Sequence, residues 1–165
     1  MPNITKIIVD GAILSILASL FIIVTLRLNP RIWLQDYPKD VQAKAPPKTS
    51  QEKRLSLFLG IPFLLLLVAT PFVSSLTLKY QTQEQISFWT LFINSFGVGF
   101  IFNLVDWLIL DWLMFCAITP KFVVIPGTEG MAGYKDYLFH FRGFLIGSVL
   151  SAVAGLIIAT IVLFL

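Results

Sequence analysis

The chain has 165 residues, of which 57% are hydrophobic and 13% are charged, and its mean hydropathy is +0.86. A soluble domain carries about 25% charged residues, so this composition excludes an ordinary soluble globular protein and predicts a single-domain integral membrane protein. The net charge of +3 comes from bases that border apolar segments, which argues against a nucleic-acid partner. One cysteine, Cys116, excludes an intramolecular disulfide and a CxxC metal or redox site.

Four apolar segments are long enough to cross a membrane as helices, because a span needs about 20 residues. The first lies between Lys6 and Arg27 and is too long for the core of a cleavable signal peptide. The others cover residues 55–78, 86–118 and 143–165. We therefore predict an all-α protein whose residues 1–165 form one bundle of four transmembrane helices.

The distribution of basic residues predicts the orientation of this bundle. The two long connections, residues 27–54 and 119–142, hold ten lysines and arginines, whereas the other side holds two, Lys6 and Lys79. Basic residues mark the cytoplasmic side of membrane proteins. We predict a multi-pass cell-membrane protein with both long connections in the cytoplasm and both termini outside.

The third apolar segment is too long for one perpendicular span. As a straight helix, residues 86–118 would extend about 50 Å, against a hydrocarbon core of about 30 Å. Trp107 and Trp112 predict that its last third lies at the membrane interface. Apolar residues at helical spacing further on predict a short cytoplasmic interfacial helix. They are Tyr134, Tyr137, Leu138 and Phe141.

Small residues recur at every fourth position of the last apolar segment. They are Gly143, Gly147, Ser151, Gly155 and Ala159. Such a stripe lets another helix backbone approach closely, so it predicts helix packing. The partner helix is either in the same chain or in another molecule. We expect the lipid bilayer as one partner, together with self-association or a membrane partner through this segment.

Polar residues within the third segment are candidates for ligand binding, because a charge inside a membrane is costly. Asn103 and Asp106 share one face of an α-helix, but Asp106 and Asp111 are about 140° apart. The two carboxylates would converge only if the helix broke between them, and we expect no metal site. The simpler alternative, which we favour, is an ion pair of Asp106 with Arg142 or Arg27 at the membrane boundary.

The loop before the last segment has a glycine at every third position, at Gly127, Gly130 and Gly133. Glycine permits positive φ and a close approach of the backbone to a ligand, so these residues are ligand-binding candidates. The loop lacks the ending of a P-loop, and Glu129 would repel a phosphate. A plain turn is the alternative that we favour.

Two further residues of this region suggest proton transfer. Asp136 and His140 lie at i and i+4, where a carboxylate can orient an imidazole. A surface pair without a function is the alternative that we favour. The candidate catalytic residues are Asp106, Glu129, Asp136 and His140, and Arg142 joins the candidate ligand-binding residues.

Two classes of function remain open on these observations. The first is a non-enzymatic, oligomerising bundle that acts as a transporter-like protein or an accessory subunit, and the small-residue stripe favours it. The alternative is a membrane-embedded enzyme that acts on a lipid or amphiphile at the cytoplasmic face. We expect no cofactor, because the chain contains no cofactor-binding motif.

Overall fold

The computed structural model describes residues 2–82 and 86–165, and four helices are long and apolar enough to cross a membrane. They are α1 (Ile4–Leu28), α3 (Ser50–Gln81), α4 (Phe88–Val105) with its continuation η2 (Asp106–Ile118), and α5 (Tyr137–Phe164). The connections hold the short helices η1 (Pro30–Asp36), α2 (Lys39–Lys44), η3 (Lys121–Val123) and η4 (Ala132–Lys135). The described residues contain no strand, so the predicted all-α class is confirmed.

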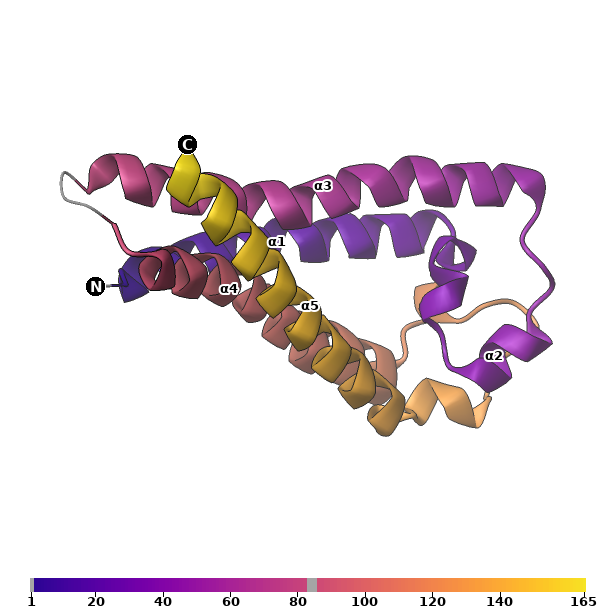
Figure 1. The fold of residues 1–165 in the computed structure, drawn as a ribbon. Coiled ribbons are helices and arrows are strands. Elements are labelled where there is room, and N and C mark those ends of the chain that lie inside the picture. The colour runs from indigo at the N-terminus through magenta and orange to yellow at the C-terminus, as the bar shows by residue number, and fades with distance from the viewer. Residues whose placement is uncertain (1, 83–85) are drawn as a thin grey trace.

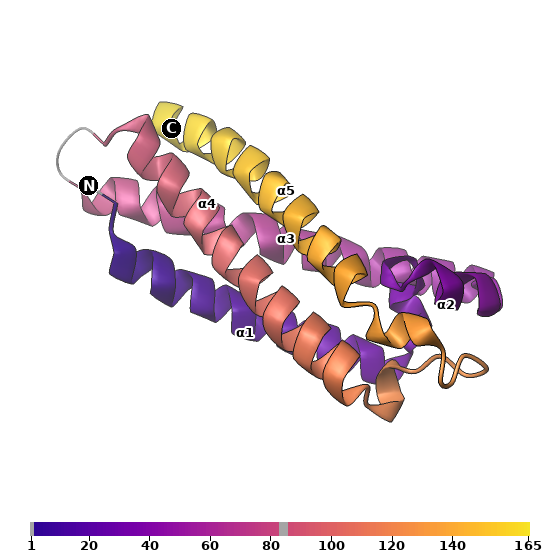
Figure 2. The ribbon, with the colours of Figure 1, turned by 90° about the horizontal axis from the view of Figure 1, so that it is seen from below.

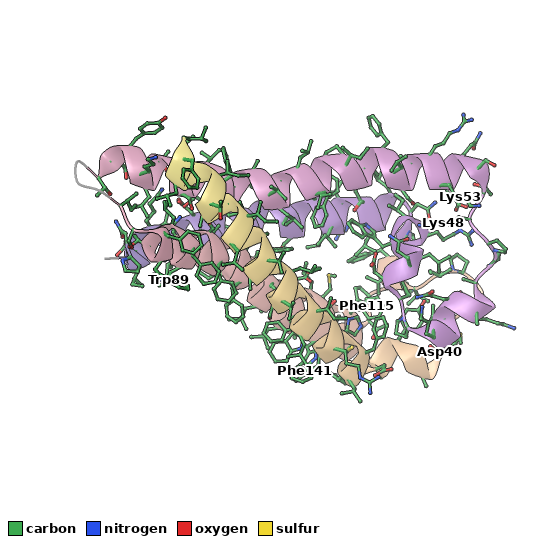
Figure 3. All side chains as sticks on the ribbon, viewed as in Figure 1. Asp40, Lys48, Lys53, Trp89, Phe115 and Phe141 are labelled. Carbon is green, nitrogen blue, oxygen red and sulfur yellow. The ribbon has the colours of Figure 1, made fainter. Side chains whose placement is uncertain are left out.

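The long helices form two pairs that pack together at one end of the bundle and diverge toward the other (Figure 1). α1 packs beside α3, α4 packs beside α5, and the contact of α1 with α4 joins the pairs. Both termini lie at the packed end, which we call the terminal end (Figure 2). The long connections lie at the opposite, loop end. Trp89 marks the terminal end, whereas Lys48 and Lys53 lie at the loop end (Figure 3).

The contact of α5 with α4 is built on the small-residue stripe. A Cβ added at Gly155 would lie 3.1 Å from the backbone nitrogen of Phe96, and one added at Gly147 would clash with the Asn103 side chain. Small side chains are therefore needed wherever α5 approaches α4. At Gly143 nothing lies within 4 Å of an added Cβ, so this position of the stripe does not contact α4. The stripe packs within the chain, and self-association stays a prediction.

The connections fold into a small structure of their own at the loop end, which we call the loop-end cap. Its apolar cluster joins α1, η1, α2, η2, η3 and η4. The Tyr37 hydroxyl donates to the carbonyl of Val123 at 2.8 Å, and the Tyr134 hydroxyl accepts from the backbone N–H of Ile125 at 2.9 Å. Asp40 accepts from the N–H of Gly133 at 2.9 Å, which fixes α2 against η4. These bonds tie together segments that are distant in sequence.

The predicted interfacial helix differs from what the structure contains. Tyr134 is buried in η4, where its hydroxyl also bonds that of Thr128 at 2.7 Å. Tyr137, Leu138 and Phe141 belong to the first turns of α5, which begins six residues before the predicted apolar segment. A buried tyrosine with two hydrogen-bond partners cannot lie on the lipid-facing side of a helix. The residues from Tyr137 onward extend the fourth long helix instead.

Candidate functional site: an acidic cavity at the loop end

A cavity of about 500 Å³ lies between the two diverging helix pairs at the loop end. Three carboxyl groups and one imidazole line it, those of Asp36, Asp106, Asp111 and His140, and they come from η1, η2 and α5. The remaining lining residues are Ile22, Leu26, Trp33, Gln35, Tyr37, Phe63, Leu67, Phe102, Asn103, Trp107, Phe115, Phe139, Gly143, Phe144, Ile146, Gly147 and Leu150. None of the described lining residues is a lysine or an arginine. The cavity is therefore acidic.

Asp106 and Asp111 reach the same cavity because η2 is a π-helix. In a π-helix each N–H donates to the carbonyl five residues back, so residues at i and i+5 lie on one face. The last bond of this kind joins the N–H of Thr119 to the carbonyl of Met114 at 2.9 Å. The expectation that the two carboxylates diverge was wrong, since it assumed α-helical geometry. The wider helix brings them together without a break in the chain.

His140 pairs with Asp111 and not with Asp136. Its Nδ1 lies 3.0 Å from Oδ1 of Asp111, and the imidazole is buried. Asp136 instead caps the start of α5, where its carboxylate accepts from the N–H of Phe139 at 2.9 Å. The predicted Asp136–His140 pair is therefore incorrect. The π-helical turn supplies the carboxylate from η2.

Asp106 is not part of an ion pair with an arginine. Among the described residues, neither an ion pair nor a hydrogen bond reaches its side chain. The guanidinium of Arg27 lies 5.0 Å above the ring of Phe122, and Arg142 is exposed on α5. The favoured interpretation, Asp106 as half of a boundary ion pair, was wrong. A carboxyl group that is left without a partner inside an apolar bundle is a candidate for ligand binding.

Two nitrogen atoms beside the cavity are also left without partners in the described part of the chain. They are Nε2 of His140 and Nε1 of Trp107, and both are buried. Buried polar atoms are nearly always hydrogen-bonded, and leaving one unsatisfied costs about 1–3 kcal/mol. Water or a ligand in the cavity would satisfy them. The site thus contains unsatisfied polar groups of both kinds, donor and acceptor.

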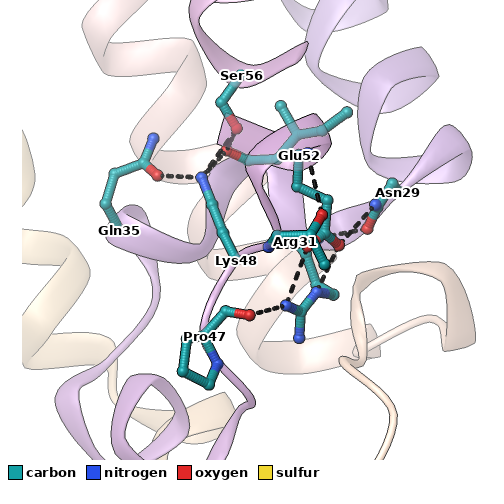
Figure 4. A network of polar contacts seen from close by, with 9 residues as sticks. Asn29, Arg31, Gln35, Pro47, Lys48, Glu52 and Ser56 are labelled. Atoms are coloured by element: carbon teal, nitrogen blue, oxygen red, sulfur yellow. Dashed lines mark hydrogen bonds and ion pairs between the residues drawn. The ribbon is translucent and has the colours of Figure 1, made fainter. Parts of the chain in front are cut away.

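A polar network holds η1, and with it Asp36, against the start of α3 (Figure 4). Arg31 pairs with Glu52 at 2.6 Å, and the ammonium group of Lys48 donates to the carbonyl of Ile32 at 2.6 Å and to Ser56 at 2.9 Å. Burial raises the pKa of Asp36, and the charge of Lys48 partly opposes that rise. The network fixes the acidic wall that faces η2.

The rest of the cavity wall is largely aromatic and aliphatic. The ring of Trp107 stacks on that of Phe144, with centroids 4.5 Å apart, and Phe63 meets Phe102 edge to face. Trp33 donates from its indole nitrogen to Thr25 at 2.9 Å, which orients its ring in the wall. Aromatic faces attract cations and also accept apolar groups. The site therefore combines negative charge with a large apolar surface.

Several predicted site residues lie away from the cavity. Glu129 is exposed and accepts from the N–H of Gly127 at 3.0 Å, which closes a turn in which Gly127 and Gly130 have positive φ. Hydrogen bonds from backbone N–H groups lower the pKa of Glu129. Gly133 faces Asp40. The glycine loop forms a turn that is also bonded to α2, and ligand binding by its glycines stays untested.

A second polar cluster, which was not predicted from the sequence, lies between α1, α3 and α4 near the terminal end. Asp10 pairs with Lys6 at 2.7 Å and accepts from Ser74 at 2.5 Å. The amide nitrogen of Asn94 donates to Ser74 and to Ser75, each at 3.0 Å. We call these residues, with Ser95, the terminal-end network. An aspartate and a run of hydroxyl residues inside apolar segments could have indicated it.

Comparison of the chain with known protein families, curated proteins and solved structures finds no match. Within the described residues, no three His, Cys, Asp or Glu side chains are placed so that they could hold a metal ion.

Proposed function

We propose that the protein is inserted in the cell membrane, with its loop end in the cytoplasm and both termini outside. The ten-to-two distribution of basic residues supports this orientation. Single cysteines can test it, because the native Cys116 is buried and adds no background. A cysteine at exposed Tyr80 should react with an impermeant maleimide in intact cells, and one at exposed Lys44 or Lys121 only after permeabilisation. Labelling of position 44 in intact cells would show that the loop end lies outside, opposite to the proposed orientation.

For function, we propose a non-enzymatic, transporter-like bundle that binds an organic cation in the loop-end cavity. One observation supports this most directly: three carboxyl groups line the cavity, and its described lining contains no basic residue except His140. Even with His140 protonated, the carboxylates would outnumber the positive charge. In a partly buried site, opposite charges at 4 Å attract by about 4 kcal/mol at an effective dielectric constant of 20. A cation would therefore be favoured over an anion.

The walls of the cavity indicate that this cation carries an apolar group. A small hydrated cation would gain little from the rings of Phe102, Trp107 and Phe144, which line the site. An organic cation can place its charge near the carboxylates and its apolar part on these rings. The class of ligand that fits both features is a lipophilic cation.

Tetraphenylphosphonium and tetraphenylborate test this proposal, because they have nearly the same shape and opposite charges. We expect the purified protein in lipid nanodiscs to bind radiolabelled tetraphenylphosphonium saturably and to show no saturable binding of tetraphenylborate. Asp106→Asn should weaken the binding about tenfold or more, which corresponds to 1.4 kcal/mol or more. Glu129→Gln removes the same charge from an exposed site outside the cavity, so it should bind like the unmodified protein. Equal binding of both ions would refute the proposal.

The alternative of an enzyme is favoured by one observation, the Asp111–His140 pair. A carboxylate at Nδ1 orients an imidazole so that Nε2 can accept a proton from a bound molecule. Against it, the described lining contains no serine, threonine or cysteine, and the hydroxyl of Tyr37 is bonded to Val123. Incubation of the reconstituted protein with a membrane lipid extract, followed by mass spectrometry, separates the two. A lipid consumed by the unmodified protein but not by His140→Gln would establish the enzyme.

A further inference from the structure

The helices α3 and α5 touch near the terminal end of the bundle. There the ammonium group of Lys79 donates to the carbonyls of Val162 and Leu163, each at 3.0 Å. Phe72 of α3 packs against the apolar cluster that contains Ile158 and Val162. Toward the loop end the two helices diverge, so that α3 continues with the α1 direction while α5 follows α4 (Figure 1).

Side chains from both helices line the cavity across this divergence. α3 contributes Phe63 and Leu67, and α5 contributes Ile146 and Leu150. Ile146 is 62% exposed and Leu150 is 63% exposed, although both line the cavity. A residue can do both only if the cavity reaches the outer surface of the bundle at that point. The apolar part of the cavity therefore opens between α3 and α5, and we call this opening the side portal.

The position of the side portal matters because of what surrounds it. The flanking positions of α5, Leu145 and Val149, are exposed and apolar, as are Leu64 and Leu65 of α3. Such a surface on a candidate membrane span faces lipid chains. The acidic residues lie farther toward the loop end, on η1 and η2. The cavity therefore runs from a lipid-facing apolar opening to a charged inner end.

We infer that the ligand is a cationic amphiphile of the inner membrane leaflet, which enters sideways between α3 and α5. Its charged group reaches Asp36, Asp106 and Asp111, while its apolar tail extends through the side portal toward the lipid. This inference rests on the proposed function and adds the source of the ligand and its route.

Tryptophan substitutions on α5 test the route, because neighbouring positions differ in whether they line the cavity. Leu150→Trp would narrow the side portal, whereas Val149→Trp adds the same ring at a position that is 64% exposed and outside the lining. We expect Leu150→Trp to slow both association and dissociation of tetraphenylphosphonium in nanodiscs about tenfold, as a narrowed entrance does. Val149→Trp should keep both rates within about twofold of those of the unmodified protein.

Equal rates for the two variants, with binding retained, would refute the side entrance and leave the proposed function intact. An unmodified protein that does not bind tetraphenylphosphonium would refute both.

If Leu150→Trp abolishes binding, photo-crosslinking tests whether the ligand passes position 150. A benzoylphenylalanine at position 150 should capture tritiated hexadecyltrimethylammonium, and excess tetraphenylphosphonium should reduce that capture. Capture at position 149 should not respond to the competitor. If excess tetraphenylphosphonium does not reduce the capture at either position, the inference is overturned.

Discussion

Each end of the helix bundle places an aspartate and an asparagine between helices, but their surroundings differ. At the terminal end, Asp10 has Lys6 and Ser74 as partners, and Asn94 donates to two serines, although its buried Oδ1 has no partner among the described residues. At the loop end, Asp106 has no partner among the described residues and faces the cavity. Asn103 is intermediate, because it lines the cavity but donates to the carbonyl of Phe144 and to the hydroxyl of Ser148, each at 3.0 Å.

This difference separates polar groups that stabilise the bundle from groups that are available to a ligand. A buried polar group that finds its partners within the protein contributes modestly to stability, and removing one partner costs more than the bond was worth. A charged group left without partners destabilises the folded protein, so its presence calls for another explanation. Binding of a ligand is the explanation that the loop-end cavity supports.

The largest loss of stability is expected where the small-residue stripe of α5 touches α4. Gly155→Leu would force a side chain into the space held by the backbone of Phe96, and we expect a loss of about 3 kcal/mol or more, or failure to fold. Gly143→Leu is the matched control, because nothing lies within 4 Å of its added Cβ. Thermal unfolding in detergent measures both. Equal melting temperatures for the two variants would contradict the packing described for α5.

A smaller effect is expected in the comparison of the two asparagines. Asn94→Leu leaves Ser74 and Ser75 without their donor in a fully buried position, and we expect a loss of about 2 kcal/mol. Asn103→Leu also removes two donor bonds, to Ser148 and to the carbonyl of Phe144, but it should cost only about 0.5 kcal/mol, because Asn103 is half-buried beside the cavity and water can replace it there. Unfolding in a denaturing detergent measures the loss of stability in each of the two variants. A larger loss for Asn103→Leu would mean that the loop end, too, depends on internal pairing.

The four candidate spans were predictable because each consists of a long apolar run between polar ones. The start of α3 was predictable as well, since Thr49 and Glu52 form the capping box that their spacing indicates. The turn in the glycine loop was predictable from its glycines, two of which have positive φ. These features depend on residues that are close together in the chain, so composition and residue spacing are enough to predict them.

The geometry of the cavity was not predictable for a specific reason. Asp106 and Asp111 are five residues apart, and only a π-helix places that spacing on one face. Nothing in residues 106–118 distinguishes a π-helix from an α-helix, because their long apolar side chains are compatible with either kind of helix. The Asp111–His140 pair depends on the same turn. Asp36 was missed because the connection that carries it is positioned by contacts with α3.

Asp106→Asn should leave the free energy of unfolding unchanged or raise it, because no described partner loses a bond and an unpartnered carboxyl group is removed. A double-mutant cycle with Arg27→Gln or Arg142→Gln should show a coupling within about 0.3–0.5 kcal/mol of zero. The same protein should bind tetraphenylphosphonium weakly. A coupling energy well above that range would support the interpretation of Asp106 as half of a boundary ion pair. Asp10→Asn is the contrasting variant, and it should lose more stability than Asp106→Asn.

The smallest effect is expected from the protonation of Asp36. Because burial raises its pKa above the ordinary value of 3.8, the folded protein holds the proton more tightly than the unfolded chain does. The contribution of this group to stability is therefore greatest below pH 3.8 and declines as the pH rises through the raised pKa. Asp36→Asn cannot ionise, so it should be progressively more stable than the unmodified protein as the pH rises.

Solvent reaches Asp36, which screens its charge and limits this difference to about 0.5 kcal/mol. Melting temperatures of both proteins in the same detergent, measured from pH 4 to pH 8, provide the comparison. Bound tetraphenylphosphonium should reduce the difference at high pH, because the cation compensates the ionised carboxylate at the inner end of the cavity. A difference that shrinks with rising pH would mean that a described cation, such as Lys48, outweighs the burial of Asp36.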